Sequence, residues 1–324
     1  MFRYNPDNMN NKIYTLILFC CIALSSCESM INDIDQDKLP KIESKLAVEC
    51  YISPQSEEIQ VRVTQSQPLF GPASYEAVYI KNANVVISGE SGRITIPYND
   101  SLKSYIAKAS LFKIEAGKKY SLLVNDGIRS VNATCTVPAN NATVKSYSIE
   151  AVTTGPRYPG DSMVEAKMSW DDIKGESNYY VIRGYADIER KVYLSNQSGG
   201  GGNIVMQRSK NVFNSSYENF LYVDTNIDGI TFKSPVFNIS LYNQRTNYLD
   251  KDGKQHTLWS DPALKEVYFE ILNMDENYYK FSKSIKDNQN SDNPFVEPAL
   301  VYTNIEGGLG CFGAYNAGNL LIKQ

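Results

Sequence analysis

The chain has little of what most enzyme active sites are built from. Its 324 residues include a single histidine, His256, and six cysteines without zinc-binding spacing. The hydrolase patterns G-x-S-x-G and H-E-x-x-H do not occur. Because a hydrolase needs a nucleophile, a base and a group that orients the base, the sequence predicts a protein that is not an enzyme.

Basic clusters and long apolar runs are also missing. Lysine and arginine are scattered and the formal net charge is −4, so we expect no nucleic-acid partner. Beyond residue 26, no apolar run approaches the roughly 18 residues that a transmembrane helix needs. The sequence therefore predicts no spanning helix in the mature chain.

The N-terminus has the form of a bacterial export signal. Lys12 precedes the apolar run TLILFCCIALSS, which is too short to cross a bilayer core of about 30 Å. The residues Leu24-Ser25-Ser26 before Cys27 resemble a lipobox, in which the cysteine thiol carries a diacylglycerol. We expect a signal peptide over residues 1–26 and lipidation of Cys27. An ordinary secretory signal with an incidental cysteine is the alternative.

A lipid anchor would hold the mature protein at a membrane without a transmembrane helix, because several acyl chains bind stably where one binds only marginally. Residues 27–40 are polar and acidic and are expected to form a tether. Acidic residues soon after a lipidated cysteine direct some lipoproteins to the cell surface, and only Glu28 is close here. The sequence leaves open whether the protein faces outward or toward the periplasm.

Residues 41–138 predict an immunoglobulin-like β-sandwich. Runs that alternate apolar and polar residues, such as EIQVRVTQSQ, recur with turn signals about every 8–12 positions. The segment KYSLLVNDGIRSVNATCTVP predicts a hairpin that turns at Asp126-Gly127. Pro138 ends the domain, because proline cannot continue a central strand.

Residues 139–324 predict a second β-rich domain, fibronectin-like or sandwich-like, with one short helix. Trp170 would fill its core, and the glycine-rich stretch at 195–203 would be a flexible loop. DENYYKFSKSIKDNQN is the helix candidate, with Asp275 as its N-cap. The whole protein is thus expected to be mainly β.

The segment DKDG at 250–253 contains part of a calcium-loop pattern. Counting from Asp250, position 5 is Lys254 and position 12 is Asp261, where an EF-hand has an oxygen ligand and a bidentate glutamate. A hairpin turn beside His256 explains the segment better. The sequence accordingly predicts no metal site and no cofactor.

After loss of the signal peptide and lipidation of Cys27, three cysteines remain: Cys50, Cys135 and Cys311. Cys50 and Cys135 lie in the first and last predicted strands of the first domain, which can be neighbours in an immunoglobulin-like sandwich. A disulfide between them would stabilise the fold by roughly 4–5 kcal/mol in the chain-entropy model. Two buried free thiols are the alternative.

The segment GLGCFG at 308–313 matches the dinucleotide-binding pattern G-x-G-x-x-G. Such a site needs the pattern between a strand and a helix, but only 11 residues follow Gly313 and their composition disfavours a helix. No histidine or cation near Cys311 in the sequence would activate its thiol. We therefore expect a final strand whose glycines allow close backbone approach, with Leu309, Cys311 and Phe312 packed.

These segments together resemble a family of Bacteroidetes lipoproteins known as domain of unknown function 4249. The resemblance covers most of the mature chain. Such proteins usually have a small residue at the position of Cys50 and a threonine near that of Cys135, so the joint appearance of two cysteines favours the disulfide. The resemblance is carried by the lipobox, LAVECYIS with the following SQPLF, the GKKYSLLV…TCTVP hairpin, YYKFSKSI and, most distinctively, NPFVEPALVYTNIEGGLGCFGAYN.

The resemblance implies an outer-membrane lipoprotein, and genes of this kind often lie beside genes for TonB-dependent receptors. It brings no catalytic residues, because the role of the family is unknown. Two triplets, Asp100-Ser101-Leu102 and Asp161-Ser162-Met163, resemble the O-glycosylation motif of exported proteins in that phylum. They would place glycans on Ser101 and Ser162, both in predicted loops.

We therefore expect a non-enzymatic outer-membrane lipoprotein that serves as a binding or accessory subunit of a TonB-dependent nutrient uptake system. Its ligand, whether a small molecule, a peptide or a glycan, is not identified by the sequence. The alternative is a structural or adhesive cell-surface protein. An envelope hydrolase that uses two carboxylates is a third hypothesis, because a sequence does not show which acids meet in space.

Overall fold

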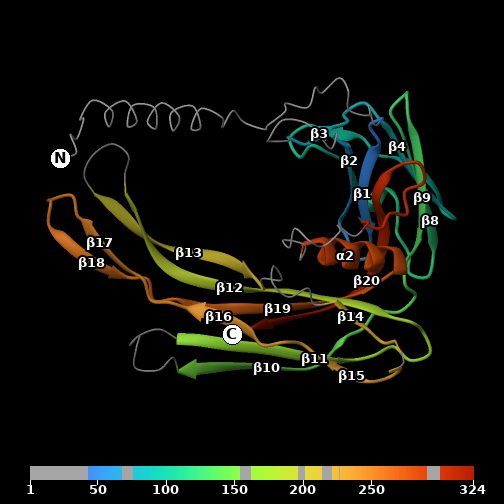
Figure 1. Ribbon diagram of the computed structural model, residues 1–324. Coiled ribbons are helices and arrows are strands. Elements are labelled where there is room, and N and C mark those ends of the chain that lie inside the picture. Colours follow the sequence, from blue (N-terminus) through green and yellow to red (C-terminus); the bar gives the residue numbers. More distant parts are fainter. Residues whose placement is uncertain are drawn as a thin grey trace, which may run out of the picture. The chain divides into compact units, whose positions relative to one another are not determined.

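The computed structural model describes residues 43–67, 76–153, 162–195, 201–213, 221–225, 227–289 and 300–324 (Figure 1). The protein is mainly β, as predicted, with several sheets and one α-helix in the described segments. The signal peptide, Cys27 and the tether lie outside the described residues. Within those residues, no helix is long and apolar enough to cross a membrane.

Two sheets form a first β-sandwich. Alternation along the strands turns every second side chain inward, so Leu46, Val48 and Cys50 join one apolar core with Leu122 and Cys135 of the opposite sheet. One sheet contains β1 (Leu46–Ile52), β2 (Glu58–Gln65), β3 (Val78–Tyr79), β6 (Tyr98–Asn99) and β7 (Ser104–Lys108); the other contains β4 (Asn84–Gly89), β5 (Gly92–Thr95), β8 (Lys119–Asn125) and β9 (Ser130–Thr136).

The β8–β9 hairpin forms where the sequence predicts it. Gly127 has a φ of +90°, which a side chain would strain, and the Asp126 carboxylate accepts hydrogen bonds from the backbone N–H groups of Ile128 and Arg129. The Arg129 guanidinium then returns to Asp126 at 2.6 Å and to Ser44 at 2.9 Å. The turn therefore ties the start of β1 to the opposite sheet.

A second β-sandwich follows along the chain. Trp170 is fully buried between its sheets, where it stacks on Phe232 and meets Tyr180 edge to face, as the sequence predicts for a core residue. One layer contains β10 (Val144–Thr153), β11 (Ser162–Asp171), β15 (Thr231–Lys233) and β16 (Phe237–Leu241); the other contains β12 (Tyr179–Ser195), β13 (Gly202–Val212), β14 (Leu221–Val223) and β19 (Ala263–Met274).

The long β12–β13 ribbon corrects one prediction. The glycine-rich stretch predicts a loop over 195–203, but Ser195 ends β12 and Gly202 begins β13, with the two residues paired. The separate hairpin of β17 (Arg245–Leu249) and β18 (Gln255–Trp259) turns through Gly253, which has a φ of +76°. That hairpin is the one predicted at DKDG.

The final strand, β20 (Leu309–Lys323), belongs to both sandwiches (Figure 1). Its first part runs parallel to β1, and its second part runs antiparallel to β19. Gly310 has a φ of +101°, and a Cβ there would overlap the carbonyl oxygen of Val48. Phe312 is fully buried in the first core. The glycines of GLGCFG thus allow a close strand pairing, as predicted, although Leu309 is exposed rather than packed.

The helix α2 (Glu276–Gln289) covers the face of β20 that points away from the first core. Asp275 is its N-cap, as predicted, because its Oδ1 accepts a hydrogen bond from the backbone N–H of Tyr278 at 2.9 Å. Tyr278 packs against Gly313 and stacks on Tyr51 with ring centroids 4.2 Å apart. A side chain at Gly313 would therefore push the helix off the sheet.

Candidate functional site

A polar groove on the outer face of the second sandwich is the candidate ligand site. It has a volume of about 480 Å³ and lies across β10 and β11 and the segment after β15. Alternation explains its lining, because the apolar side chains of β11 face the core and its polar ones face outward. The lining residues are Ser146, Tyr147, Ser148, Glu150, Lys167, Met168, Ser169, Lys233 and Ser234.

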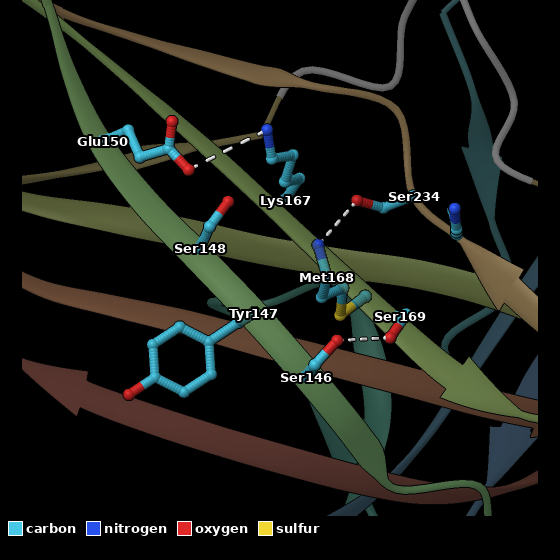
Figure 2. Close-up of a pocket in the computed structure, with 9 residues that line it drawn as sticks. Ser146, Tyr147, Ser148, Glu150, Lys167, Met168, Ser169 and Ser234 are labelled. Atoms are coloured by element: carbon cyan, nitrogen blue, oxygen red, sulfur yellow. Dashed lines mark hydrogen bonds and ion pairs between the residues drawn. The ribbon is translucent and has the colours of Figure 1, made fainter.

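Figure 2 shows the hydrogen bonds and the ion pair between residues that line the groove. The hydroxyls of Ser146 and Ser169 lie 2.7 Å apart across the two strands, and Ser234 Oγ accepts a hydrogen bond from the backbone N–H of Met168 at 2.9 Å. The ammonium of Lys167 lies 4.0 Å from Glu150, a separation at which an exposed ion pair contributes little. The lysine is thus available to another partner.

The groove combines several hydrogen-bonding side chains with apolar surface. Lys167 and Lys233 supply two cations against the single carboxylate of Glu150. The Ser148 hydroxyl is buried and has no hydrogen-bond partner within the described structure. These groups suit a polar ligand with hydroxyl or acidic groups, such as a glycan or a peptide carboxylate.

The only histidine of the sequence stabilises a turn and does not lie in a cluster of reactive side chains among the described residues. His256 Nε2 lies 2.7 Å from Asp250 Oδ2, and its ring stacks on Tyr248. Asp250 Oδ1 accepts hydrogen bonds from the backbone N–H groups of Asp252 and Lys254. The hydrogen bond from His256 and these backbone bonds lower the pKa of Asp250. These hydrogen bonds therefore stabilise the β17–β18 turn, in agreement with the hairpin that the sequence favours over a calcium loop.

The three cysteines of the described chain are buried free thiols. Burial raises the pKa of Cys50, Cys135 and Cys311 well above the ordinary thiol value, so none has the thiolate character of a nucleophile. Cys50 and Cys135 lie in opposite sheets of the first core, in β1 and β9 as predicted. The structure does not contain the bridge between them, and the disulfide stays a prediction.

The two candidate glycosylation sites differ. Ser101 is exposed in the turn after β6, where Asp100 pairs with Lys81 at 2.6 Å. Ser162 is the first residue of β11 and pairs with Thr153 and Leu241, so its predicted loop position is wrong. Both serines are exposed, but a glycan on Ser162 would stand at the end of a paired strand.

A smaller hollow of about 270 Å³ surrounds the N-terminus of α2. Asp275, Glu276 and Glu176 line it together with Thr136 and Asn273. Burial raises the pKa of Asp275 from its ordinary value of 3.8 to about 6, against the backbone N–H groups of Tyr278, Ala314 and Thr136, which lower it. Its Oδ2 is buried without a hydrogen-bond partner in the described structure. This is where the carboxylate-hydrolase hypothesis would place its acid.

The sequence analysis did not identify one cluster of three aspartates. Asp172, Asp224 and Asp228 each place a carboxylate oxygen within 4.8 Å of the other two. In the described part of the chain, this is the one group of histidine, cysteine or acidic side chains close enough to hold a metal ion. The sequence signal for it is the alternation of Asp224, Asn226 and Asp228 before a glycine.

The distal β12–β13 ribbon carries exposed apolar side chains. Ile204 and Met206 are 48% and 54% exposed and share one face with Tyr193 and Lys191, to which they pair. Leu194, on the opposite face, is 54% exposed. Exposed apolar side chains that adjoin one another can form an interaction surface. We call Ile204 and Met206 the ribbon patch.

Comparison with known families places the chain. The family described as "Domain of unknown function (DUF4249)" matches residues 32–320. Because the match covers most of the sequence, the chain belongs to that family. No curated protein matches the chain.

Proposed function

We propose that this member of the DUF4249 family is a lipid-anchored outer-membrane protein of a Bacteroidetes bacterium, with a binding or accessory role beside a TonB-dependent transporter. The lipobox ending at Cys27 supports the anchor. Genes of the family that it resembles often lie beside genes for TonB-dependent receptors, which supports the transporter as its partner. The protein itself carries out no reaction in this proposal.

The observation that carries the proposal is the ribbon patch. A two-stranded ribbon that extends past its core gains little stability from burial, since β13 is exposed along most of its length. The exposed isoleucine and methionine of the ribbon patch lie two positions apart on one face and are suited to a partner that covers them. An accessory subunit that docks on a receptor needs a surface of this kind.

The groove between β10 and β11 supplies the second half of the proposal. Its serine hydroxyls and lysine ammonium groups can form hydrogen bonds with a bound ligand. A protein that captures a polar nutrient and releases it to a transporter needs such modest, reversible contacts. The ribbon patch would then bind the receptor while the groove binds the ligand.

Affinity purification from detergent-solubilised membranes tests the receptor contact. We expect a TonB-dependent receptor to co-purify with the full chain and to be lost with the double variant Ile204→Ser, Met206→Ser. Each half-buried apolar side chain contributes about 1 kcal/mol when covered, so the double variant should weaken the complex roughly 30-fold.

The matched control is Ile128→Ser, which removes a 92% exposed isoleucine from the β8–β9 turn of the first sandwich. It should leave the receptor bound. Recovery without any outer-membrane receptor would refute the accessory role, and recovery of host-matrix or cell-surface adhesion partners would favour the structural or adhesive alternative. Cys27→Ala should release the protein from the membrane fraction, and its retention there would refute the lipid anchor.

A further inference from the structure

We propose that the hollow at the N-terminus of α2 binds a small primary alkylamine in its ammonium form. The hollow has a volume of about 270 Å³ and is formed by three segments: the end of β9, the loop before β12 and the link from β19 to α2. Its lining residues are not among those of the groove between β10 and β11, and they do not include the ribbon patch. The amine site is therefore independent of the proposed receptor and ligand contacts.

The buried amide of Asn178 points to a ligand that donates hydrogen bonds. Asn178 lines the hollow and is only 2% exposed. Its Oδ1 has no hydrogen-bond partner within the described structure, and its Nδ2 donates one long bond, 3.5 Å to Asn273 Oδ1. Buried amide groups are normally hydrogen-bonded, because an unpaired one costs its full desolvation free energy. A donor bound in the hollow would remove that cost.

Asp275 brings a second unpaired acceptor to the same hollow. Its Oδ1 caps α2, whereas its Oδ2 is buried without a hydrogen-bond partner among the described residues. The pKa of about 6 leaves this carboxyl mostly ionised at neutral pH. Asn178 and Asp275 come from separate segments, and one of the two unpaired acceptors carries a charge. A cation that also donates hydrogen bonds satisfies both needs.

The hollow is acidic. Glu176 and Glu276 line it in exposed positions, and no lysine or arginine of the described chain is among its lining residues. Glu276 already pairs with Lys280 at 2.9 Å, and Glu176 accepts a hydrogen bond from Asn140 Nδ2 at 2.8 Å. Asp275 is thus the buried carboxylate that lacks a counter-charge. The excess of negative charge attracts cations and repels anions.

An anion and a metal ion fit the hollow less well than an ammonium group. Anions bind the free N–H groups at a helix N-terminus, but here the Asp275 carboxylate already accepts the N–H of Tyr278. The three carboxylates that line the hollow do not converge within 4.8 Å, as shared metal ligands would. An ammonium group needs no such convergence, because its three N–H donors point in different directions.

Apolar and aromatic lining residues favour a short alkyl chain on the ammonium group. Pro138, Met274 and Tyr179 all line the hollow. Tyr179 is held by stacking on Tyr279, with ring centroids 4.4 Å apart. Methylene groups gain from burial against such side chains, and a tyrosine ring also attracts a cation. The volume lies below the roughly 300–1,000 Å³ of sites for drug-sized ligands, so the hollow suits an amine of a few carbons.

Titration of the mature chain with butylamine at pH 7.5 tests the site. The ¹⁵N NMR signals of the Asn178 and Asn273 side-chain amides should shift with a Kd on the order of 1 mM, as suits so small a ligand. At about tenfold above the Kd, butylamine should raise the Tm by about 2 °C. Butanol, which has no charge, and tetramethylammonium, which has no N–H donor, should bind at least about tenfold more weakly. Nα-acetyl-lysinamide separates two sources of the same ammonium: binding equal to that of butylamine supports a site that also takes a lysine side chain, and weaker binding supports a site for free amines.

Two variants make the test specific. Asn178→Leu removes the unpaired acceptor at similar volume, and Asp275→Asn removes the charge but keeps the helix cap. Each should fold and should weaken butylamine binding at least about tenfold, with the Asn273 amide as the reporter. If Asn178→Leu folds poorly, Asp275→Asn decides the test, because that variant is expected to be more stable than wild type. Asn247→Leu and Asp252→Asn, on the exposed β17–β18 hairpin, are the matched controls and should keep the wild-type response.

Four results would overturn the proposal. Equal effects of butylamine and tetramethylammonium would show screening of surface charge without a site. A butylamine response that survives in both Asn178→Leu and Asp275→Asn would place the binding elsewhere. Shifts of the same two amides with Ca²⁺ and not with butylamine would assign a metal ion. The absence of any response to butylamine would show that ordered water alone satisfies the two acceptors.

Discussion

Asp275 should destabilise the folded protein at neutral pH, and its replacement by asparagine should stabilise it. The carboxyl caps α2 through Oδ1, while Oδ2 is buried without a partner in the described structure. Burial raises its pKa from 3.8 to about 6. The difference, at about 1.36 kcal/mol for each pH unit, corresponds to roughly 3 kcal/mol between charged and neutral forms. Asparagine keeps the acceptor that caps the helix and avoids the buried charge.

The sign of the pH dependence follows from the raised pKa. Below about pH 3.8 the carboxyl is neutral in both the folded and the unfolded chain, so the full stability is present. As pH rises toward 6, the unfolded chain ionises first, and the free energy of unfolding falls. Above about pH 6 the loss is complete. The gap between Asp275→Asn and wild type should thus grow from about 0.6 kcal/mol at pH 4 to about 3 kcal/mol at pH 7.

Urea unfolding at pH 4, 5 and 7 measures this gap. Glu276→Gln is the matched control, because Glu276 is exposed in the same helical turn and forms only a surface ion pair with Lys280 at 2.9 Å. Its effect should stay within about 0.5 kcal/mol at every pH. Equal stability of Asp275→Asn and wild type at pH 7, or a gap that does not depend on pH, would refute the reasoning. A stable Asp275→Asn variant that also loses a glycosidase activity would instead favour the hydrolase hypothesis.

Two further predictions concern the glycines and the thiols. Gly310→Val should lower the free energy of unfolding by at least about 3 kcal/mol, since it adds a clash with Val48 to an unfavourable positive φ. Gly253→Val is also at a positive φ but in open space, so it should cost only about 1–2 kcal/mol in the same urea assay. Equal costs would show that the close approach is unimportant. Alkylation of the native chain produced without residues 1–27 should modify none of its three thiols, because all are buried. After denaturation without reductant, three modified thiols would exclude the disulfide, and one would establish it.

Local patterns were sufficient for the elements that local interactions define. The β8–β9 and β17–β18 hairpins each need a turn glycine between two alternating runs, and the sequence shows both. The cap of α2 needs only Asp275 and the backbone one turn ahead. The burial of Trp170 follows from its size and its place in an alternating strand.

Contacts between distant residues were not predictable in the same way. The final strand pairs with β1 and β19, which are far apart in the sequence, and no local pattern records such partners. The ribbon strand β13 was missed because its mostly exposed residues lack the apolar alternation of a half-buried strand. The acidic cluster combines Asp172 with residues more than 50 positions later, and only the Asp224–Gly229 spacing was visible in the sequence.

The position of β20 explains why the glycine-rich segment is a poor marker of chemistry. Gly310 approaches the β1 backbone and Gly318 approaches the carbonyl of Ala142, so the same strand needs glycine against both sandwiches. Gly313, between them, makes room for Tyr278 of α2. Side chains are excluded at these positions by neighbouring backbone and helix, whatever ligand the protein binds. Differences in function within such a fold should therefore arise at the β12–β13 ribbon, the outer groove and the acidic loops, where side chains are free to change.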